Sequence, residues 1–135
     1  MYELVQLSVV APDRSVIDQP VESVVVPGTE GYFGILAGHT PLIASLQPGI
    51  VEYVERGERH YLSVSGGFAE VSDGEVTLLV DSAEMPSQID ISRAERALDQ
   101  ARKTLRGEGD GSVSMEEATD KLNRAIHRIR VAKHG

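Results

Sequence analysis

Five polar side chains in the last third of the chain have the types and spacing of a phosphate-binding surface. Arg93, Arg96 and Gln100 step by three and four residues, and Arg124 and Arg128 are four residues apart. Residues at these spacings share one face of a helix. An arginine side chain can bind a phosphate group through two parallel hydrogen bonds. The pattern therefore indicates an anionic ligand, with a solvated helical surface as the alternative for most of these residues.

Other short motifs do not indicate catalysis or metal binding. The glycine-rich run 31–38 lacks the Gly-Lys-Ser/Thr ending of a phosphate loop. Ser65 lacks the Gly-x-Ser-x-Gly spacing of a nucleophile elbow. His39 and His60 are far apart in the sequence and have no carboxylate at metal-ligand spacing. We therefore expect no catalytic residues and no metal site.

The elements that position the arginines follow from a change in hydrophobic periodicity near Pro86. Before this residue, apolar residues alternate or form short β-branched runs separated by Gly and Pro, which is typical of strands. After it, apolar residues recur every three or four positions, which is typical of helices. We predict a β domain over residues 1–86 and an α-helical domain over residues 87–135.

Short strands and tight turns in the β domain predict a sandwich or barrel. We expect a first strand over residues 3–10 and a short second strand that ends at Pro20. Glycine and proline in the run 31–42 favour tight turns there. Two hairpins are expected, at 56–57 and at 73–74. The pair Asp73-Gly74 suits a type I′ turn, because both central residues tolerate positive φ angles.

Two apolar stripes in the α-helical domain predict an antiparallel helical hairpin. Ser87 with Asp90 can start the first helix, Gly107 can stop it, and Ser114 with Glu117 forms a capping box for the second. The stripes are rich in alanine, so the helices can approach closely but bury little apolar area. We infer that the hairpin is marginally stable alone and depends on a partner or ligand. The stripe residues are Ile91, Ala94, Leu98, Ala101 and Leu105, then Met115, Ala118, Leu122, Ala125, Ile129 and Ala132.

Charge is divided unevenly between the two domains. Residues 1–85 have a net charge of −10 and residues 86–135 a net charge of +2, with ten of the thirteen Lys and Arg residues in the second part. An acidic β domain argues against nucleic-acid binding through its sheet. The chain has no Cys and, in sequence, no segment that predicts a membrane span or signal peptide.

Two glycine-rich runs resemble a known family. They are GYFGILAGHTPL at 31–42 and VSGGFAEV at 64–71. Both closely resemble the epsilon subunit of rotary F-type ATP synthases, and the resemblance extends over essentially the whole chain. One departure is Ala37, where the family often has Pro, which affects loop stiffness.

The resemblance implies a ten-stranded β-sandwich followed by a two-helix hairpin, and a place in the central rotor at the cytoplasmic face of the cell membrane. The sandwich would bind the gamma subunit and the ring of c subunits. The subunit would be non-catalytic and would couple rotation to proton flow. Its hairpin would inhibit ATP hydrolysis by extending along gamma toward the catalytic alpha and beta subunits.

The segment Ile89 to Ala94 also resembles the bacterial ATP-binding motif Ile/Leu-Asp-x-x-Arg-Ala. This implies ATP as a regulatory ligand, with or without Mg²⁺, that favours the folded-back hairpin. By this resemblance Glu84 would contact the base region and Arg93 would meet the phosphates. Arg124 and Arg128 match the basic ligands of the second helix in that family. Gln100 falls where a thermophilic homologue has Arg, which removes one candidate phosphate contact. The residues that would surround the nucleotide are Ile89, Asp90 and Ala94.

Three functional hypotheses follow from these observations. The first is a regulatory and coupling subunit of an ATP synthase. The second is a free-standing ATP-sensing module, which co-purification with a gamma subunit would separate from the first. The third is a small β-sandwich enzyme, which ranks last for want of catalytic residues.

Overall fold

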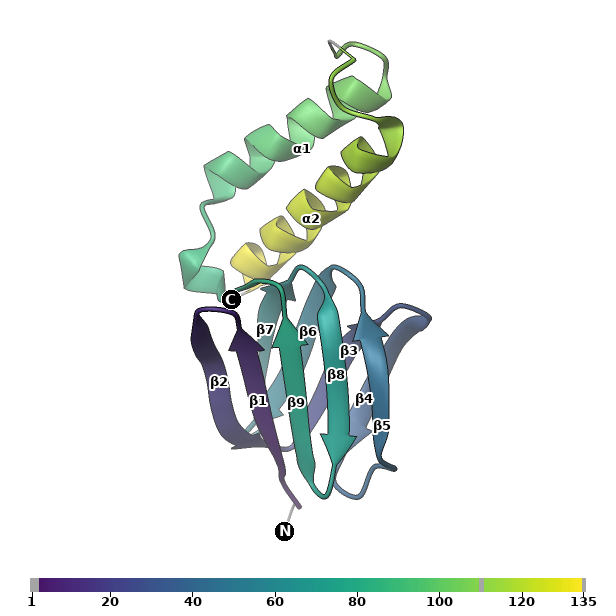
Figure 1. Cartoon of the computed structure of the whole chain (residues 1–135). Coiled ribbons are helices and arrows are strands. Elements are labelled where there is room, and N and C mark those ends of the chain that lie inside the picture. The colour runs from purple at the N-terminus through teal and green to yellow at the C-terminus, as the bar shows by residue number, and fades with distance from the viewer. Residues whose placement is uncertain (1–2, 110, 135) are drawn as a thin grey trace.

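Ten strands and two helices make up the computed structural model, which describes residues 3–109 and 111–134. The strands come first and the helices follow, as the sequence predicts (Figure 1). The strands are β1 Val5–Ala11, β2 Arg14–Val21, β3 Ser23–Gly28, β4 Gly31–Leu36, β5 Leu42–Leu46, β6 Gly49–Glu55, β7 Glu58–Val64, β8 Gly67–Ser72, β9 Glu75–Val80 and β10 Ala83–Glu84.

The strands form a sandwich with two layers. Hydrogen bonds connect them in the order β10-β7-β6-β3-β5-β8-β9-β1-β2, and β4 pairs with β3. All neighbours are antiparallel except β1 and β9, which are parallel. Alternate side chains from both layers point inward, so that Leu7, Val24, Leu62 and Leu78 are fully buried between them.

Turn chemistry accounts for both predicted hairpins. Arg56 and Gly57 join β6 to β7 with φ angles of 52° and 77°, and Asp73 and Gly74 join β8 to β9 with φ angles of 47° and 79°. Positive φ at both central positions matches the twist of the flanking strands. Both hairpin predictions are confirmed.

Two local predictions in the β domain are wrong. Pro20 does not end the second strand, because β2 continues to Val21. This strand lies at the edge of the sheet, where a residue without a backbone N–H is tolerated. The run 31–42 is not all turns, since its first half is β4, paired along its length with β3. Gly31 and Gly38, near the two ends of β4, lie where the chain turns into and out of that strand.

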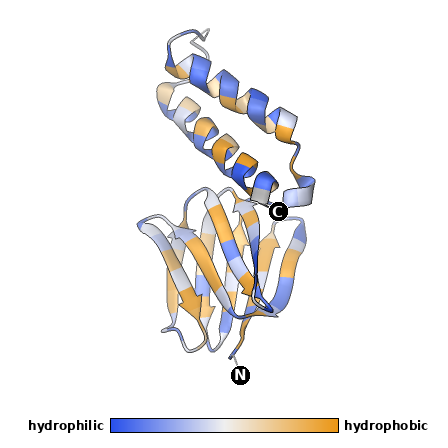
Figure 2. Ribbon diagram, turned by 180° about the vertical axis from the view of Figure 1, so that it is seen from behind, coloured by the Kyte–Doolittle hydropathy of each residue, from blue (hydrophilic) through white to orange (hydrophobic). Residues whose placement is uncertain are grey.

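The helices α1, Ile91–Leu105, and α2, Met115–His134, form the predicted hairpin (Figure 1). Four alanines are buried where they meet, and apolar residues recur along both helices (Figure 2). Ile91 and Met115 are exposed, so the first member of each predicted stripe does not pack. The close approach follows from the small alanine side chains. The four buried alanines are Ala94, Ala101, Ala118 and Ala125.

The hairpin docks on one end of the sandwich mainly through α2. This helix contacts β6, β7 and the short 3₁₀ helix η1, Pro86–Gln88. Val131, near the end of α2, is buried although it lies outside the predicted stripe. The last turns of α2 therefore pack against both α1 and the sandwich. A single apolar stripe in the sequence predicts only the first of these contacts.

Candidate functional site

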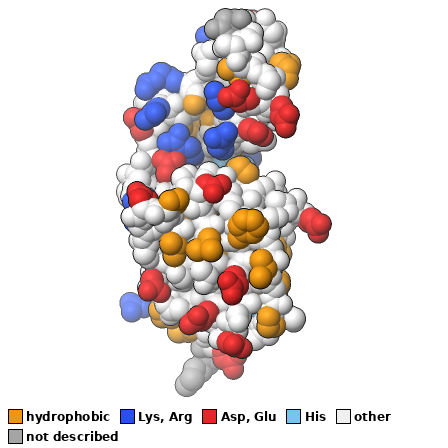
Figure 3. All heavy atoms as spheres, in the orientation of Figure 1, with side chains coloured by type: hydrophobic (Ala, Val, Ile, Leu, Met, Phe, Trp, Pro, Cys, Tyr) orange, Lys and Arg blue, Asp and Glu red, His pale blue; other side chains and the backbone are white. Residues whose placement is uncertain are grey.

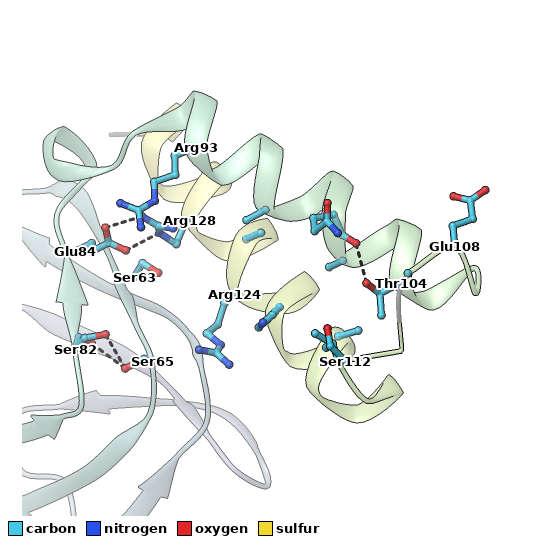
Figure 4. Close-up of a pocket in the computed structure, with 18 of the residues that line it drawn as sticks. Ser63, Ser65, Ser82, Glu84, Arg93, Thr104, Glu108, Ser112, Arg124 and Arg128 are labelled. Carbon is cyan, nitrogen blue, oxygen red and sulfur yellow. Dashed lines mark hydrogen bonds and ion pairs between the residues drawn. The ribbon is translucent and has the colours of Figure 1, made fainter.

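A pocket of about 800 Å³ lies between the hairpin and the end of the sandwich (Figure 4). The two helices supply facing walls, the edge formed by β7 and β10 supplies a third, and the α1–α2 connector closes the far end. Its polar lining residues are Ser63, Ser65, Ser82, Glu84, Arg93, Gln100, Thr104, Glu108, Ser112, Lys121, Arg124 and Arg128.

Four cationic side chains line the pocket from the two helices. Lys121, Arg124 and Arg128 follow spacings of three and four residues, which place them on one face of α2. Arg93 reaches the pocket from the first turn of α1. Two carboxylates also line it, so the cations are in excess. A concave site with this charge balance attracts an anion.

The strongest interaction inside the pocket is an ion pair between Arg128 and Glu84. Arg128 Nη2 donates a hydrogen bond to Glu84 Oε2 at 2.9 Å. Its Nε lies 2.6 Å from Oε1, an ion-pair contact without the angle of a hydrogen bond. Both side chains are about one quarter to one third exposed. The pair therefore ties α2 to the last strand of the sandwich in a partly water-excluded position.

Asp90 caps the first helix. Its Oδ1 accepts a hydrogen bond from the backbone N–H of Arg93 at 3.0 Å. The carboxylate also complements the positive end of the helix dipole. The capping function predicted for this end of the helix is confirmed for Asp90, whereas Ser87 lies within η1 and is not the N-cap of α1.

Three of the seven candidate nucleotide-binding residues lie outside the pocket lining. Ile89 and Ala94 are buried, Ala94 against α2, and Asp90 is at the helix cap. The other four converge on the pocket, as Figure 4 shows, and they are Glu84, Arg93, Arg124 and Arg128. The structure thus brings together the three arginines among the candidate nucleotide-binding residues.

Sequence reasoning missed several pocket residues and included one that does not belong. Arg96 is exposed and does not line the pocket. Lys121 lines the pocket, and its spacing of three from Arg124 could have revealed it. The serines at the sandwich edge had no sequence signal, because only the docking of the hairpin brings them near the helices.

His127, beside Arg128 on α2, is in an unusual environment. Its Nδ1 is buried and has no hydrogen-bond partner among residues 3–109 and 111–134. Burial, and then the nearby positive charge of Arg130, lower the pKa of the imidazole below its usual value of 6.5. The folded chain therefore favours the neutral form of this side chain.

The two histidines considered for metal binding have ordinary environments. His60 stacks on Tyr53 with ring centroids 5.2 Å apart, and His39 Nδ1 contacts the backbone oxygen of Thr40. Over residues 3–109 and 111–134, no three His, Asp or Glu side chains are grouped to hold a metal ion. In the same part of the chain, neither helix is long and apolar enough to cross a membrane.

The sequence matches two family models that together cover nearly all of the chain. Residues 4–86 match the model described as ATP synthase, Delta/Epsilon chain, beta-sandwich domain. Residues 87–133 match the model described as ATP synthase, Delta/Epsilon chain, long alpha-helix domain. The chain belongs to the delta/epsilon chain family of ATP synthases.

Individual members of this family are similar over most of their length. The ATP synthase epsilon chain of Nitratidesulfovibrio vulgaris (strain DP4) is 42% identical over 131 residues, 97% of each chain. That of Desulfitobacterium hafniense (strain DSM 10664 / DCB-2) is 40% identical over 129 residues, covering 95% of this chain and 96% of the relative.

Two solved structures contain chains with a similar fold. A chain in the Euglena gracilis mitochondrial ATP synthase, in a structure of OSCP, F1 and the c-ring, matches with a TM-score of 0.75 and 27% identity. The match covers 97% of this chain and 80% of that one. A chain in the central stalk and c-ring structure of the Tetrahymena thermophila mitochondrial ATP synthase has a TM-score of 0.59 at 12% identity, which shows the fold alone.

Proposed function

We propose that this chain is the epsilon subunit of a proton-translocating ATP synthase, a non-catalytic part of the central stalk that couples rotation to proton flow. The match of both domains to one family, in sequence and in fold, supports this assignment. The subunit works at the cytoplasmic face of the cell membrane and meets the membrane only through the complex.

An apolar patch on the sandwich, Ile43, Phe68 and Leu79, is the proposed contact with the gamma subunit. Phe68 and Leu79 are directly opposite each other on β8 and β9, and Ile43 lies on the adjacent β5. All three side chains are more than half exposed. Figure 3 shows hydrophobic side chains gathered on this face of the sandwich. An exposed apolar cluster of this kind marks a protein interface, whereas the acidic charge of the domain favours no anionic partner.

The loops at the ends of the sandwich are the proposed contact with the ring of c subunits. The loop that contains His39 joins β4 to β5 and is partly exposed. Connecting loops lie at the ends of a sandwich and commonly carry its binding residues.

The pocket is proposed to bind ATP as a regulatory ligand. The observation that carries this proposal is the convergence of Arg93, Arg124 and Arg128, from two helices, on one cavity large enough for a small-molecule ligand. Because the described residues include no metal-binding group, any Mg²⁺ would enter on the phosphates of the nucleotide.

ATP bound in this pocket stabilises the folded-back hairpin, since the pocket exists only when α1 and α2 face the sandwich. A ligand at one hundred times its dissociation constant adds about 2.7 kcal/mol to the state that binds it. That amount converts an even mixture of two states to about 99 to 1. When ATP is scarce, the hairpin opens, and its cations meet the catalytic alpha and beta subunits and inhibit ATP hydrolysis.

A titration of the full-length chain with ATP by calorimetry tests the ligand. Distance probes at Ser92 on α1 and Ala132 on α2, measured in the assembled enzyme with and without ATP, test the regulation. We expect the two positions to separate when ATP is removed. An unchanged distance, together with inhibition that is indifferent to ATP, would limit any bound nucleotide to a structural role.

Co-purification with a gamma subunit separates this proposal from a free-standing ATP sensor. Phe68→Glu should abolish co-purification, because it buries a charge in the apolar patch. Met115→Glu is the matched control, since Met115 is equally exposed but lies on the hairpin. Wild-type protein that binds ATP but never co-purifies with gamma would favour the free-standing sensor.

A further inference from the structure

In the ion pair with Glu84, the guanidinium of Arg128 is already bound to a carboxylate. This guanidinium is the group that an anionic ligand would use. Nε and Nη2 of the guanidinium lie 2.6 and 2.9 Å from the two carboxylate oxygens, and Nη2 donates a hydrogen bond. A phosphate group binds arginine best through two neighbouring nitrogens of this kind. A phosphate that approaches the same two nitrogens must first displace Glu84.

The same pair also connects the two domains. Glu84 lies on β10 and Arg128 on α2, 44 residues further along the chain. The side chains that are buried where the two helices meet are small alanines, which contribute little apolar burial. A partly buried, charge-assisted hydrogen bond therefore matters for holding α2 against the sandwich when no ligand is present.

We propose that Glu84 is a built-in competitor for the ligand of this pocket. Without ligand, its carboxylate neutralises Arg128 and adds stability to the folded-back hairpin, though less than bound ATP adds. When a polyphosphate enters, its oxygens replace the carboxylate on Arg128. Glu84 thus raises the ligand concentration needed to fill the pocket, while its ion pair partly opposes the opening of the empty hairpin.

This inference rests on the proposed function for the identity of the ligand, ATP, and it deepens that function by adding a residue that sets affinity. The inference predicts that removing the charge of Glu84 changes ligand affinity in the direction opposite to that expected for a ligand-binding residue. If Glu84 contacts the base region through its carboxylate, removing the charge weakens binding. If it competes for Arg128, removing the charge strengthens binding.

Glu108 offers a matched control inside the same pocket. It also lines the cavity, but its carboxylate pairs with Arg106, which does not line the cavity. Glu84→Gln and Glu108→Gln each remove one negative charge from the lining and keep the size of the side chain. Only the first frees a pocket arginine. A general electrostatic effect would therefore appear in both variants, and competition in Glu84→Gln alone.

The first experiment titrates the full-length wild type and the two variants by calorimetry with ATP and, separately, with inorganic tripolyphosphate. Glu84→Gln should bind both anions about threefold to tenfold more tightly, the range for loss of a competing, partly exposed ion pair. Glu108→Gln should change affinity by less than about twofold, as for a screened rim charge. Tripolyphosphate has no base, so a gain that appears with ATP alone would place the effect at the base and overturn the proposal.

The titrations distinguish a failure of the competitor assignment from a failure of the proposed ATP site. If the wild type binds ATP but Glu84→Gln binds it no more tightly, the competitor assignment is wrong and the proposed ATP site stands. Equal gains in both variants also overturn it. If no chain binds either anion, the ATP site and the competitor assignment are both wrong.

A second experiment tests the holding function without any nucleotide. Hydrogen exchange of the backbone amides in α2 should be about threefold to tenfold faster in Glu84→Gln than in the wild type, and unchanged in Glu108→Gln. High salt should narrow the difference by screening the wild-type pair. Identical exchange in the wild type and Glu84→Gln would show that the pair does not hold the hairpin.

Discussion

The Asp90 carboxylate accepts the backbone N–H of Arg93, so that the residue that starts α1 also fixes the position of the first arginine of the pocket. Capping and ligand binding are therefore physically linked at this end of the hairpin. The link means that a variant of Asp90 can change ATP affinity without any direct contact between Asp90 and the nucleotide.

Asp90→Ala should destabilise the chain by about 1 kcal/mol, the usual cost of losing an N-cap, and should weaken ATP binding. Asp90→Asn keeps a side-chain oxygen that can accept the same hydrogen bond and is the matched control. Chemical denaturation and ATP calorimetry on both variants measure the two effects. Recovery of ATP affinity in Asp90→Asn would assign Asp90 to capping, whereas persistent loss would indicate a direct contact through its charge.

Arg93→Ala and Arg124→Ala should each weaken ATP binding by about 1.5–3 kcal/mol, the scale of a hydrogen bond to a charged group. Arg130→Ala is the control, because Arg130 is an exposed arginine of α2 that does not line the pocket. Calorimetry on the three variants gives the comparison. Unchanged ATP affinity in both pocket variants would show that Arg93 and Arg124 do not bind the nucleotide and act only as surface charges.

Lys121→Ala should weaken ATP binding by a smaller amount, about 0.5–1 kcal/mol, since its side chain is about half exposed. Lys103→Ala is closely matched, because each lysine pairs with a carboxylate four residues earlier and is about half exposed, but only Lys121 lines the pocket. We expect Lys103→Ala to leave ATP affinity unchanged. Equal effects in both variants would mean that only the net charge of the hairpin matters.

His127 should make the folded chain less stable in mild acid. Because its pKa is lowered in the folded state, the unfolded chain takes up a proton first as the pH falls below about 6.5. The free energy of unfolding should therefore decrease from pH 7.5 to pH 5.5, with the loss complete below the folded-state pKa. Denaturant titrations of the wild type and His127→Gln at both pH values measure this. A decrease of the same size in His127→Gln would assign it to other groups.

Local sequence signals determined the elements of this fold. The change from alternating to helical periodicity near Pro86 separates strands from helices. Asp90 and Ser114 start the two helices, and Gly57 and Gly74 turn the two hairpins, because each effect depends on neighbouring residues only. Helical spacing likewise placed Arg124 and Arg128 on one face.

Tertiary structure decided how those elements pack and which of their side chains meet. Pro20 remains within a strand only because β2 is a sheet edge, and Val131 is buried only because α2 docks on the sandwich. Glu84 and Arg128 meet across 44 residues, and this contact changes the expected effect of Glu84 on the ligand from support to competition. Hydrophobic periodicity does not encode this contact. It depends on how the hairpin folds back against the sandwich and thereby places Arg128 beside Glu84.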